Sequence, residues 1–242
     1  MKKHIPNLIT LGNLFCGAIA TYMAAFGRFQ GAALFMLFGI LLDFCDGLAA
    51  RLLKVTSELG KELDSLADLV TSGMAPGFIL FNILWNHNTS IELKYVALLI
   101  PVFAAYRLAK FNLDETQHSI FRGLPAPANA IIWAGVGLWY PDVFCPSAFC
   151  NTGLVVLAAV SLFTDILMVS RIPMISMKFD FHNLSWHSNA PRYIFLIGAV
   201  IIIAVFQFVM TNLLASLPFL VLWYILLSLC FRKNLLSNEH QS

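Results

Sequence analysis

Long apolar runs alternate along the chain with short stretches that hold most of its Lys, Arg, Asp and Pro residues. An apolar run of about 17 to 25 residues can cross the hydrocarbon core of a bilayer as a helix. Read this way, the sequence predicts an all-α, polytopic transmembrane bundle. Because there is no internal repeat and no linker, it predicts one domain over residues 1–242. The eight spans expected lie at residues 8–26, 30–50, 58–84, 94–112, 126–140, 152–170, 193–212 and 214–231.

Composition agrees with a membrane protein. Hydrophobic residues make up 59% of the chain and charged residues only 12%, whereas about 25% charged residues is usual for a soluble domain. The net charge of +2 is too small to suggest a nucleic-acid partner. We therefore expect membrane lipid as the surroundings and no nucleic acid as a partner.

The basic residues predict the orientation in the membrane. With eight spans, only Arg28 and Lys94 of the 15 Lys and Arg residues fall on one side. Cytoplasmic loops are enriched in Lys and Arg, so the other side is predicted to be cytoplasmic, and both termini with it. That side holds Lys2, Lys3, Arg51, Lys54, Lys61, Arg107, Lys110, Arg122, Arg171, Lys178, Arg192, Arg232 and Lys233.

Four aspartates stand near the cytoplasmic ends of the second and third predicted spans. Asp43 and Asp46 are three residues apart, and Asp64 and Asp68 are four apart, so each pair lies on one face of its helix. The second helix reaches the cytoplasmic boundary where the third leaves it, so the two pairs should meet at similar depth. A solvated helix end explains a single pair of aspartates better than it explains two facing pairs.

Carboxylates this close repel one another and are costly to place at the hydrocarbon edge, so a cation should offset them. Oxygen ligands in this number suit Mg²⁺, Mn²⁺ or Ca²⁺. Two ions shared by four aspartates would suit phosphoryl transfer. An ion or proton transporter is the alternative, but its carboxylates would be expected near the midplane among broken helices.

The residues around the aspartates read D-x-x-D-G-x-x-A-R-x8-G-x-x-x-D-x-x-x-D from Asp43 to Asp68. This pattern resembles the signature of the CDP-alcohol phosphotransferase family and matches it at every position. The resemblance implies that Asp43, Asp46 and Asp64 bind divalent metal, Mg²⁺ or Mn²⁺ and two ions in all. It implies that Asp68 is the general base and also lies close to the metals.

The same resemblance implies a set of contacts to the CDP part of a lipid donor. Gly47 would allow close approach of the ligand, and Arg51 would bind phosphate oxygens. Ser57 stands where the family often has a donor-phosphate contact. Asn7 and Thr10, near the start of the first span, resemble the family's N-terminal nucleotide contact, with helix capping as the alternative for both.

Four further segments resemble the serine phosphatidyltransferases of bacteria within this family: 6–17, 107–112, 121–130 and 168–179. The resemblance implies transfer of the phosphatidyl group from CDP-diacylglycerol to L-serine with release of CMP. It also implies a homodimer in the bacterial inner membrane, with its active site at the cytoplasmic face. Glycerol 3-phosphate or inositol phosphate remains an alternative acceptor.

The serine carboxylate needs a cation, and Arg107 and Arg122 are the candidates. Arginines at helix ends also serve topology and bind anionic lipid, which is the alternative explanation for each of them. On the opposite side of the membrane, Cys145 and Cys150 share a loop and could form a small disulfide or remain two free thiols.

Overall fold

The computed structural model describes residues 4–55, 57–86, 92–113, 121–143, 150–175, 186–210 and 213–231. A helix lies in each of the eight ranges predicted as spans. The elements are α1 (His4–Ala25), α2 (Phe29–Leu53), α3 (Glu58–Asp68), the π-helix η1 (Leu69–Met74), α4 (Ala75–Asn86), the 3₁₀ helix η2 (Glu92–Leu98), α5 (Leu99–Leu113), β1 (Phe121–Arg122), α6 (Ala126–Val143), α7 (Cys150–Val169), β2 (Pro173–Met174), α8 (Trp186–Met210), the 3₁₀ helix η3 (Leu213–Ser216) and α9 (Leu217–Cys230).

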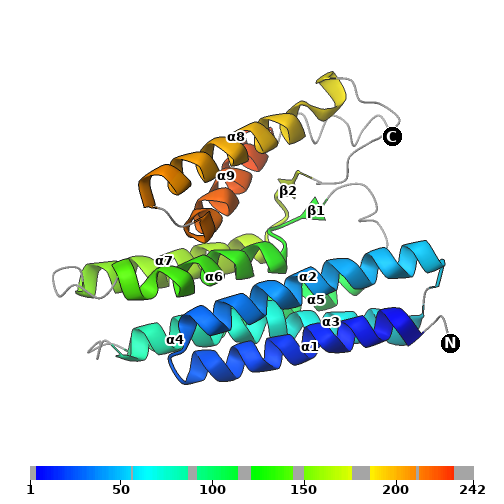
Figure 1. Cartoon of the computed structure of the whole chain (residues 1–242), viewed down its shortest axis with the longest axis horizontal. Coiled ribbons are helices and arrows are strands. Elements are labelled where there is room, and N and C mark those ends of the chain that lie inside the picture. Colours follow the sequence, from blue (N-terminus) through cyan, green and yellow to red (C-terminus); the bar gives the residue numbers. More distant parts are fainter. Residues whose placement is uncertain are drawn as a thin grey trace.

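The prediction of a polytopic all-α membrane bundle is confirmed. Six helical segments of the described chain are long and apolar enough to cross a membrane, and α9 is a shorter apolar helix. The helices form three tiers: α1 to α5, then α6 with α7, then α8 with α9 (Figure 1). The tiers are joined because α6 packs on both α2 and α9, while α7 packs on α5.

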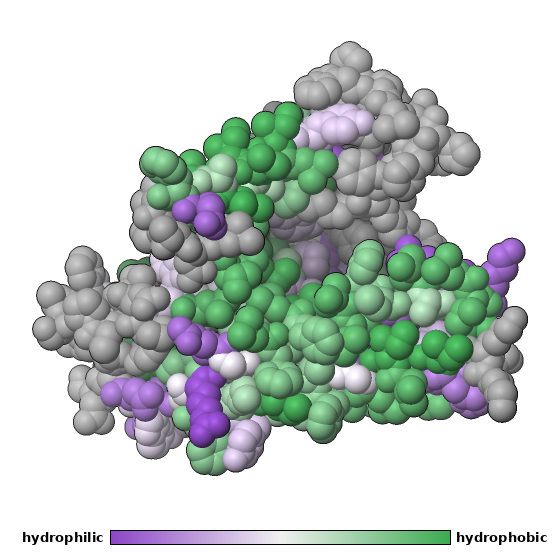
Figure 2. Space-filling view, viewed as in Figure 1, coloured by the Kyte–Doolittle hydropathy of each residue, from purple (hydrophilic) through white to green (hydrophobic). Residues whose placement is uncertain are grey.

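Small side chains let the first two helices approach closely. Ala20 and Ala24 of α1 and Ala32 and Ala33 of α2 are fully buried, and α1 and α2 share an extensive contact. The outward faces carry large apolar side chains, among them Phe15, which is 67% exposed. Figure 2 shows these hydrophobic residues covering broad areas of the lower tiers and of α8. Such a surface is suited to contact with lipid chains.

A π-helical turn interrupts the third span directly after Asp68. Insertions of this kind are rare and are often found at functional sites. Here the turn buries Thr71, whose hydroxyl donates to the side-chain oxygen of Asn13 on α1 at 2.7 Å. Gly17 makes this close approach possible, because a Cβ there would lie 2.9 Å from the backbone N and Cα of Thr71.

The small sheet formed by β1 and β2 was not expected from the sequence. Phe121 pairs with Met174 and Arg122 with Pro173 in antiparallel register. Gly123 follows with a φ of +79°, and its N–H donates to the carbonyl of Ile172 at 2.9 Å. A residue before proline favours extended backbone, and glycine tolerates positive φ. These local features favour an extended segment and a turn. They do not identify the partner strand, which is about 50 residues away along the chain.

Two predictions are not tested by the structure. Cys145 and the side chain of Cys150 lie outside the described residues, so the disulfide stays a prediction. The membrane orientation, with both termini cytoplasmic, also stays a prediction. Cys16, Cys45 and Cys230 are free thiols.

We expect Gly17→Ala to destabilise the protein because the added methyl group meets the backbone of η1. Overpacking of this kind costs about 1–3 kcal/mol. Gly153→Ala in α7 is the matched control, since a Cβ there meets nothing within 4 Å and alanine favours a helix. Thermal unfolding in detergent should show a lower midpoint for Gly17→Ala only. Equal midpoints for the two variants would contradict the close packing of α1 on η1.

Candidate functional site

Three carboxylates from two helices come together at the ends of α2 and α3. Asp43, Asp46 and Asp64 each offer an oxygen, and these oxygens all lie within 4.8 Å of one another. Asp43 and Asp64 are within hydrogen-bonding reach of each other, and Asp46 is buried, with 6% of its surface exposed. Both helix stripes expected from the sequence contribute to this cluster, which we call the aspartate cluster.

The donor set fits a hard divalent cation. Two oxygens bound to one Mg²⁺ at about 2.1 Å can lie no more than about 4.2 Å apart. The spread of 4.8 Å among the three carboxylate oxygens therefore needs only small side-chain movements to close around an ion. Asp43, Asp46 and Asp64 could thus hold a metal.

Thr10 holds one of these carboxylates from α1. Its hydroxyl lies 2.6 Å from Oδ2 of Asp46 and 3.0 Å from the carbonyl of Pro6 in its own helix. The hydroxyl has one proton to share between them, and the shorter contact to the charged acceptor is the stronger. Thr10 is itself buried. It therefore orients Asp46 in addition to lying beside the cavity described next.

A cavity of about 570 Å³ opens beside the aspartate cluster between α1, α2 and α3. Gly47 faces open space, because the one side chain of the described residues near a Cβ placed there would be the Arg51 guanidinium, at 3.8 Å. At Gly60, a Cβ would lie 2.9 Å from Ser57 and 3.0 Å from Asn7. We call this space the α1–α3 cavity; its lining is Pro6, Asn7, Thr10, Asp46, Gly47, Ala50, Val55, Ser57, Glu58, Gly60, Lys61 and Asp64.

The remaining residues predicted for the donor have local contacts as well. The Nε of Arg51 donates to the carbonyl of Gly47 along α2 at 3.1 Å. Ser57 caps α3, its hydroxyl accepting from the N–H of Gly60 at 3.0 Å. Lys61 lines the cavity and donates to the carbonyl of Asn112 at the end of α5, at 2.9 Å. Lys61 was not among the predicted site residues, although its place three residues before Asp64 puts it on the same side of α3.

Asp68 stands one turn beyond Asp64, at the last residue of α3 before the π-helix. It is outside the three-carboxylate group but interacts electrostatically with Asp64 and Asp46. Asn13 of α1 lies close to it, and the positive charge of Arg107 attracts it. Asp68 therefore interacts both with the aspartate cluster and with a cation on α5.

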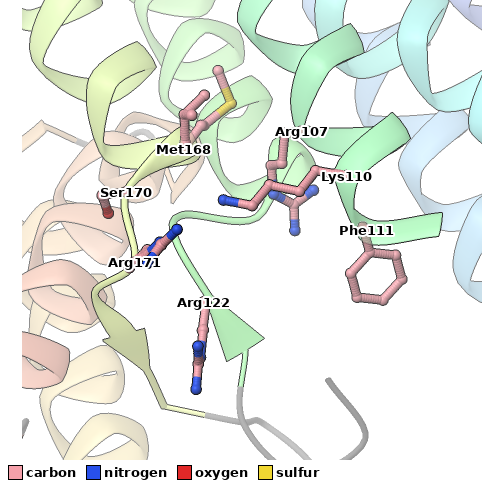
Figure 3. A pocket seen from close by; sticks show the side chains of 8 residues that line it. Arg107, Lys110, Phe111, Arg122, Met168, Ser170 and Arg171 are labelled. Carbon is pink, nitrogen blue, oxygen red and sulfur yellow. The ribbon is translucent and has the colours of Figure 1, made fainter. Parts of the chain in front are cut away.

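That neighbour belongs to a second cavity, of about 260 Å³, which we call the basic cavity. Figure 3 shows the charged ends of Arg107, Lys110 and Arg171 directed toward a common space, while Arg122 extends away from it along β1. The basic cavity is lined by Arg107, Lys110 and Phe111 of α5, Arg122 of β1, and Met168, Val169, Ser170 and Arg171 at the end of α7. Arg107 and Arg122, the two cations predicted to meet an acceptor carboxylate, thus share one cavity.

The Nε of Arg107 is buried and has no hydrogen-bond partner within the described part of the chain. A buried charged donor without a partner is costly, so an anionic ligand at this position would be stabilising. Because Arg107 lines the basic cavity and also attracts Asp68, it connects that cavity to the aspartates.

Two residues of the site's support were not singled out from the sequence. Asn13 is fully buried, and its side-chain oxygen accepts a hydrogen bond from the Thr71 hydroxyl. Asn13 also lies close to Asp68. Thr71 is buried in η1. A signal existed, because Thr10, Asn13 and Gly17 stand at i, i+3 and i+7 and form a polar and small stripe along an otherwise apolar helix.

Comparison with known proteins agrees with this geometry. Residues 3–166 match the sequence profile of the CDP-alcohol phosphatidyltransferases. The chain belongs to that family. The matched region contains the aspartate cluster, the α1–α3 cavity and the half of the basic cavity that α5 and β1 line, while the end of α7, β2, α8 and α9 lie beyond it.

Relatives at about one-third identity share one name, CDP-diacylglycerol–serine O-phosphatidyltransferase. The protein of that name from Bacillus subtilis is 34% identical over 149 residues, 62% of this chain and 84% of the relative. The one from Mycobacterium leprae is 31% identical over 253 residues, 97% of this chain and 75% of the relative. For Helicobacter pylori the identity is 36% over 129 residues, which span only 54% of the relative.

We expect Thr10→Val to weaken divalent-metal binding, because Asp46 loses the hydroxyl that orients it. Removing a residue that orients a metal ligand typically costs about 10- to 100-fold in affinity. Thr10→Ser keeps the hydroxyl and is the control. Mn²⁺ binding to the purified protein, followed by electron paramagnetic resonance, should separate the two variants. Unchanged Mn²⁺ affinity in Thr10→Val would show that this hydrogen bond does not support the cluster.

Proposed function

We propose that this chain is a CDP-diacylglycerol–serine O-phosphatidyltransferase of the bacterial inner membrane, with its active site at the cytoplasmic face. It transfers the phosphatidyl group of CDP-diacylglycerol to L-serine and releases CMP. The observation that carries the proposal is the position of Arg107, which joins the basic cavity to Asp68 beside the aspartate cluster. We further propose that residues 1–242 act as one domain and that two copies form a homodimer.

The α1–α3 cavity receives the CDP part of the donor. The absence of a side chain at Gly47 leaves room beside Asp46, and Lys61 brings a positive charge to the wall. Polar groups for the nucleotide come from Asn7, Thr10 and Ser57. The Arg51 side chain gives up its hydrogen bond to the carbonyl of Gly47 and binds phosphate oxygens instead. Because the outer faces of α1 and α2 are apolar, the acyl chains of the donor can stay in the lipid bilayer beside them.

Asp43, Asp46 and Asp64 would hold Mg²⁺ or Mn²⁺, two ions in all, with Asp68 close to them. Metal held by these carboxylates would supply positive charge for the diphosphate of the donor and for the charge that develops on it. Thr10 keeps Asp46 oriented from α1. Asn13 and Thr71 brace the turn after Asp68, so the carboxylates are set before substrate arrives.

Asp68 accepts the proton of the serine hydroxyl. The serine oxygen forms a bond to the phosphorus that carries diacylglycerol, and the bond from that phosphorus to the bridging oxygen breaks with CMP leaving. A carboxylate is a weak base for a hydroxyl, so proton transfer accompanies bond formation late in the step. Arg107 binds the serine carboxylate, with Arg122 at the outer part of the same cavity.

The second candidate acceptor is a sugar or polyol phosphate, such as glycerol 3-phosphate or inositol phosphate. Four cationic side chains line the basic cavity, which is more positive charge than one carboxylate needs. Phosphate also suits arginine, because its oxygens accept paired N–H donors. This alternative changes the acceptor and leaves the donor, metal and base roles unaltered.

Purified protein with labelled CDP-diacylglycerol and a panel of acceptors tests the proposal. We expect phosphatidylserine and CMP from L-serine, and little product from ethanolamine, which lacks the carboxylate that Arg107 binds. EDTA should stop the reaction and Mg²⁺ or Mn²⁺ should restore it. Product from glycerol 3-phosphate but not from serine would overturn the acceptor, and full turnover in EDTA would overturn the metal.

We expect Asp68→Asn to bind CDP-diacylglycerol but to transfer it slowly, because an amide cannot take the hydroxyl proton. A general base contributes typically about 10²- to 10⁴-fold, so kcat should fall by that order. Glu62→Gln, an exposed carboxylate on the same helix, is the control and should keep its rate. Serine turnover at the wild-type rate in Asp68→Asn would assign the base elsewhere.

A further inference from the structure

Helix α9 holds the segment that follows β2 by two hydrogen bonds to a single residue. The hydroxyl of Tyr224 donates to the carbonyl of Ile175 at 3.0 Å. The N–H of Ile175 donates to the hydroxyl of Ser228 at 3.3 Å. Tyr224 and Ser228 are one helical turn apart and both are buried. Both main-chain polar groups of Ile175 are therefore bound by α9.

This pair of bonds bears on the basic cavity through the small sheet. Ile175 follows β2, and β2 pairs with β1, which places Arg122 opposite Pro173. The N–H of Gly123 reaches the carbonyl of Ile172, so the residues between Arg171 and Ile175 form one unit with β1. Arg122 and Arg171 both line the basic cavity. The placement of two of its cations thus depends on how α9 holds Ile175.

Tyr224 also interacts with Arg107, another cation of the basic cavity. Its hydroxyl is close enough to Arg107 for the two groups to interact electrostatically. Tyr224 is not among the described residues that line the basic cavity, but it belongs to the same buried cluster as Met168, which does line it. Tyr224 therefore links the segment after β2 to the residues around the cavity.

Helix α9 lies beyond residues 3–166, the part that matches the family profile. The aspartate cluster and the α1–α3 cavity fall within the matched part, and neither is lined by α9. An element that holds the segment next to the basic cavity and lines neither donor feature is placed to affect the acceptor more than the donor.

We propose that Tyr224 and Ser228 are positioning residues for the acceptor, and that α9 through them sets the affinity and the stereoselectivity of the basic cavity. The inference rests on the proposed function, since it takes the basic cavity as the acceptor site. The alternative is that the two hydrogen bonds only stabilise the fold, in which case acceptor and donor kinetics would be affected alike.

Steady-state kinetics of Tyr224→Phe and Ser228→Ala test the inference, with serine and CDP-diacylglycerol varied separately. One buried hydrogen bond is worth about 0.5–1.5 kcal/mol, or roughly 2- to 12-fold. We expect the KM for L-serine to rise by that factor in each variant and the KM for CDP-diacylglycerol to stay unchanged. The preference for L-serine over D-serine should fall, because the cations no longer hold one geometry.

Two further variants sharpen the result. Tyr22→Phe, an exposed tyrosine on α1, is the matched control and should behave as wild type. The double variant Tyr224→Phe/Ser228→Ala should raise the serine KM by less than the product of the single effects, since both residues hold Ile175. Thermal unfolding of each variant records any general loss of stability.

An unchanged serine KM in both single variants would overturn the inference, as would an equal rise in the KM of both substrates. If Tyr224→Phe does not fold, Ser228→Ala decides, because it removes only a hydroxyl. A wild-type enzyme that makes no product from serine refutes the proposed function instead. The same KM comparison, made with whichever acceptor the wild type uses, then tests α9 on its own.

Discussion

Mutual repulsion among the aspartates is the constraint on which most of this structure depends. Three carboxylates whose oxygens lie within 4.8 Å of one another stand on helices that otherwise suit a membrane, where desolvated charge is costly. Their placement is maintained by neighbours on other helices: Thr10 bonds Asp46, and Asn13 joins Thr71 to the surroundings of Asp68. The close contact of α1 with η1, which only glycine at position 17 permits, serves the same end.

Arg107 gives the site its two-sided character. In the proposed reaction, a donor diphosphate would bind at the aspartates, whereas an acceptor with a carboxylate would need a cation. The α1–α3 cavity is lined by Asp46 and Asp64, whereas the basic cavity is lined by Arg107, whose charge attracts Asp68. This difference in charge would favour a separate cavity for each substrate, with Asp68 as the proposed base.

The part of the site that could be predicted is the part that is local in sequence. Asp43 and Asp46 share a helix face by spacing, and so do Asp64 and Asp68. The short connection between α2 and α3 brings the two faces together. The third span was expected to be a single α-helix, yet it contains a π-helical turn. This turn places Thr71 against Asn13 and Gly17 of α1, so its cause lies in the packing between helices. No spacing rule within residues 58–84 contains that information.

The apolar runs by themselves determined a bundle of membrane helices, because a backbone in lipid must satisfy its hydrogen bonds within a helix. The aspartate spacing determined the reaction class through its match to the family. Only the tertiary structure decided that Arg107, Arg122 and Arg171 share one cavity, and that Tyr224 interacts with Arg107. These residues come from α5, β1, the end of α7 and α9, and contacts across more than 100 residues depend on how the tiers pack.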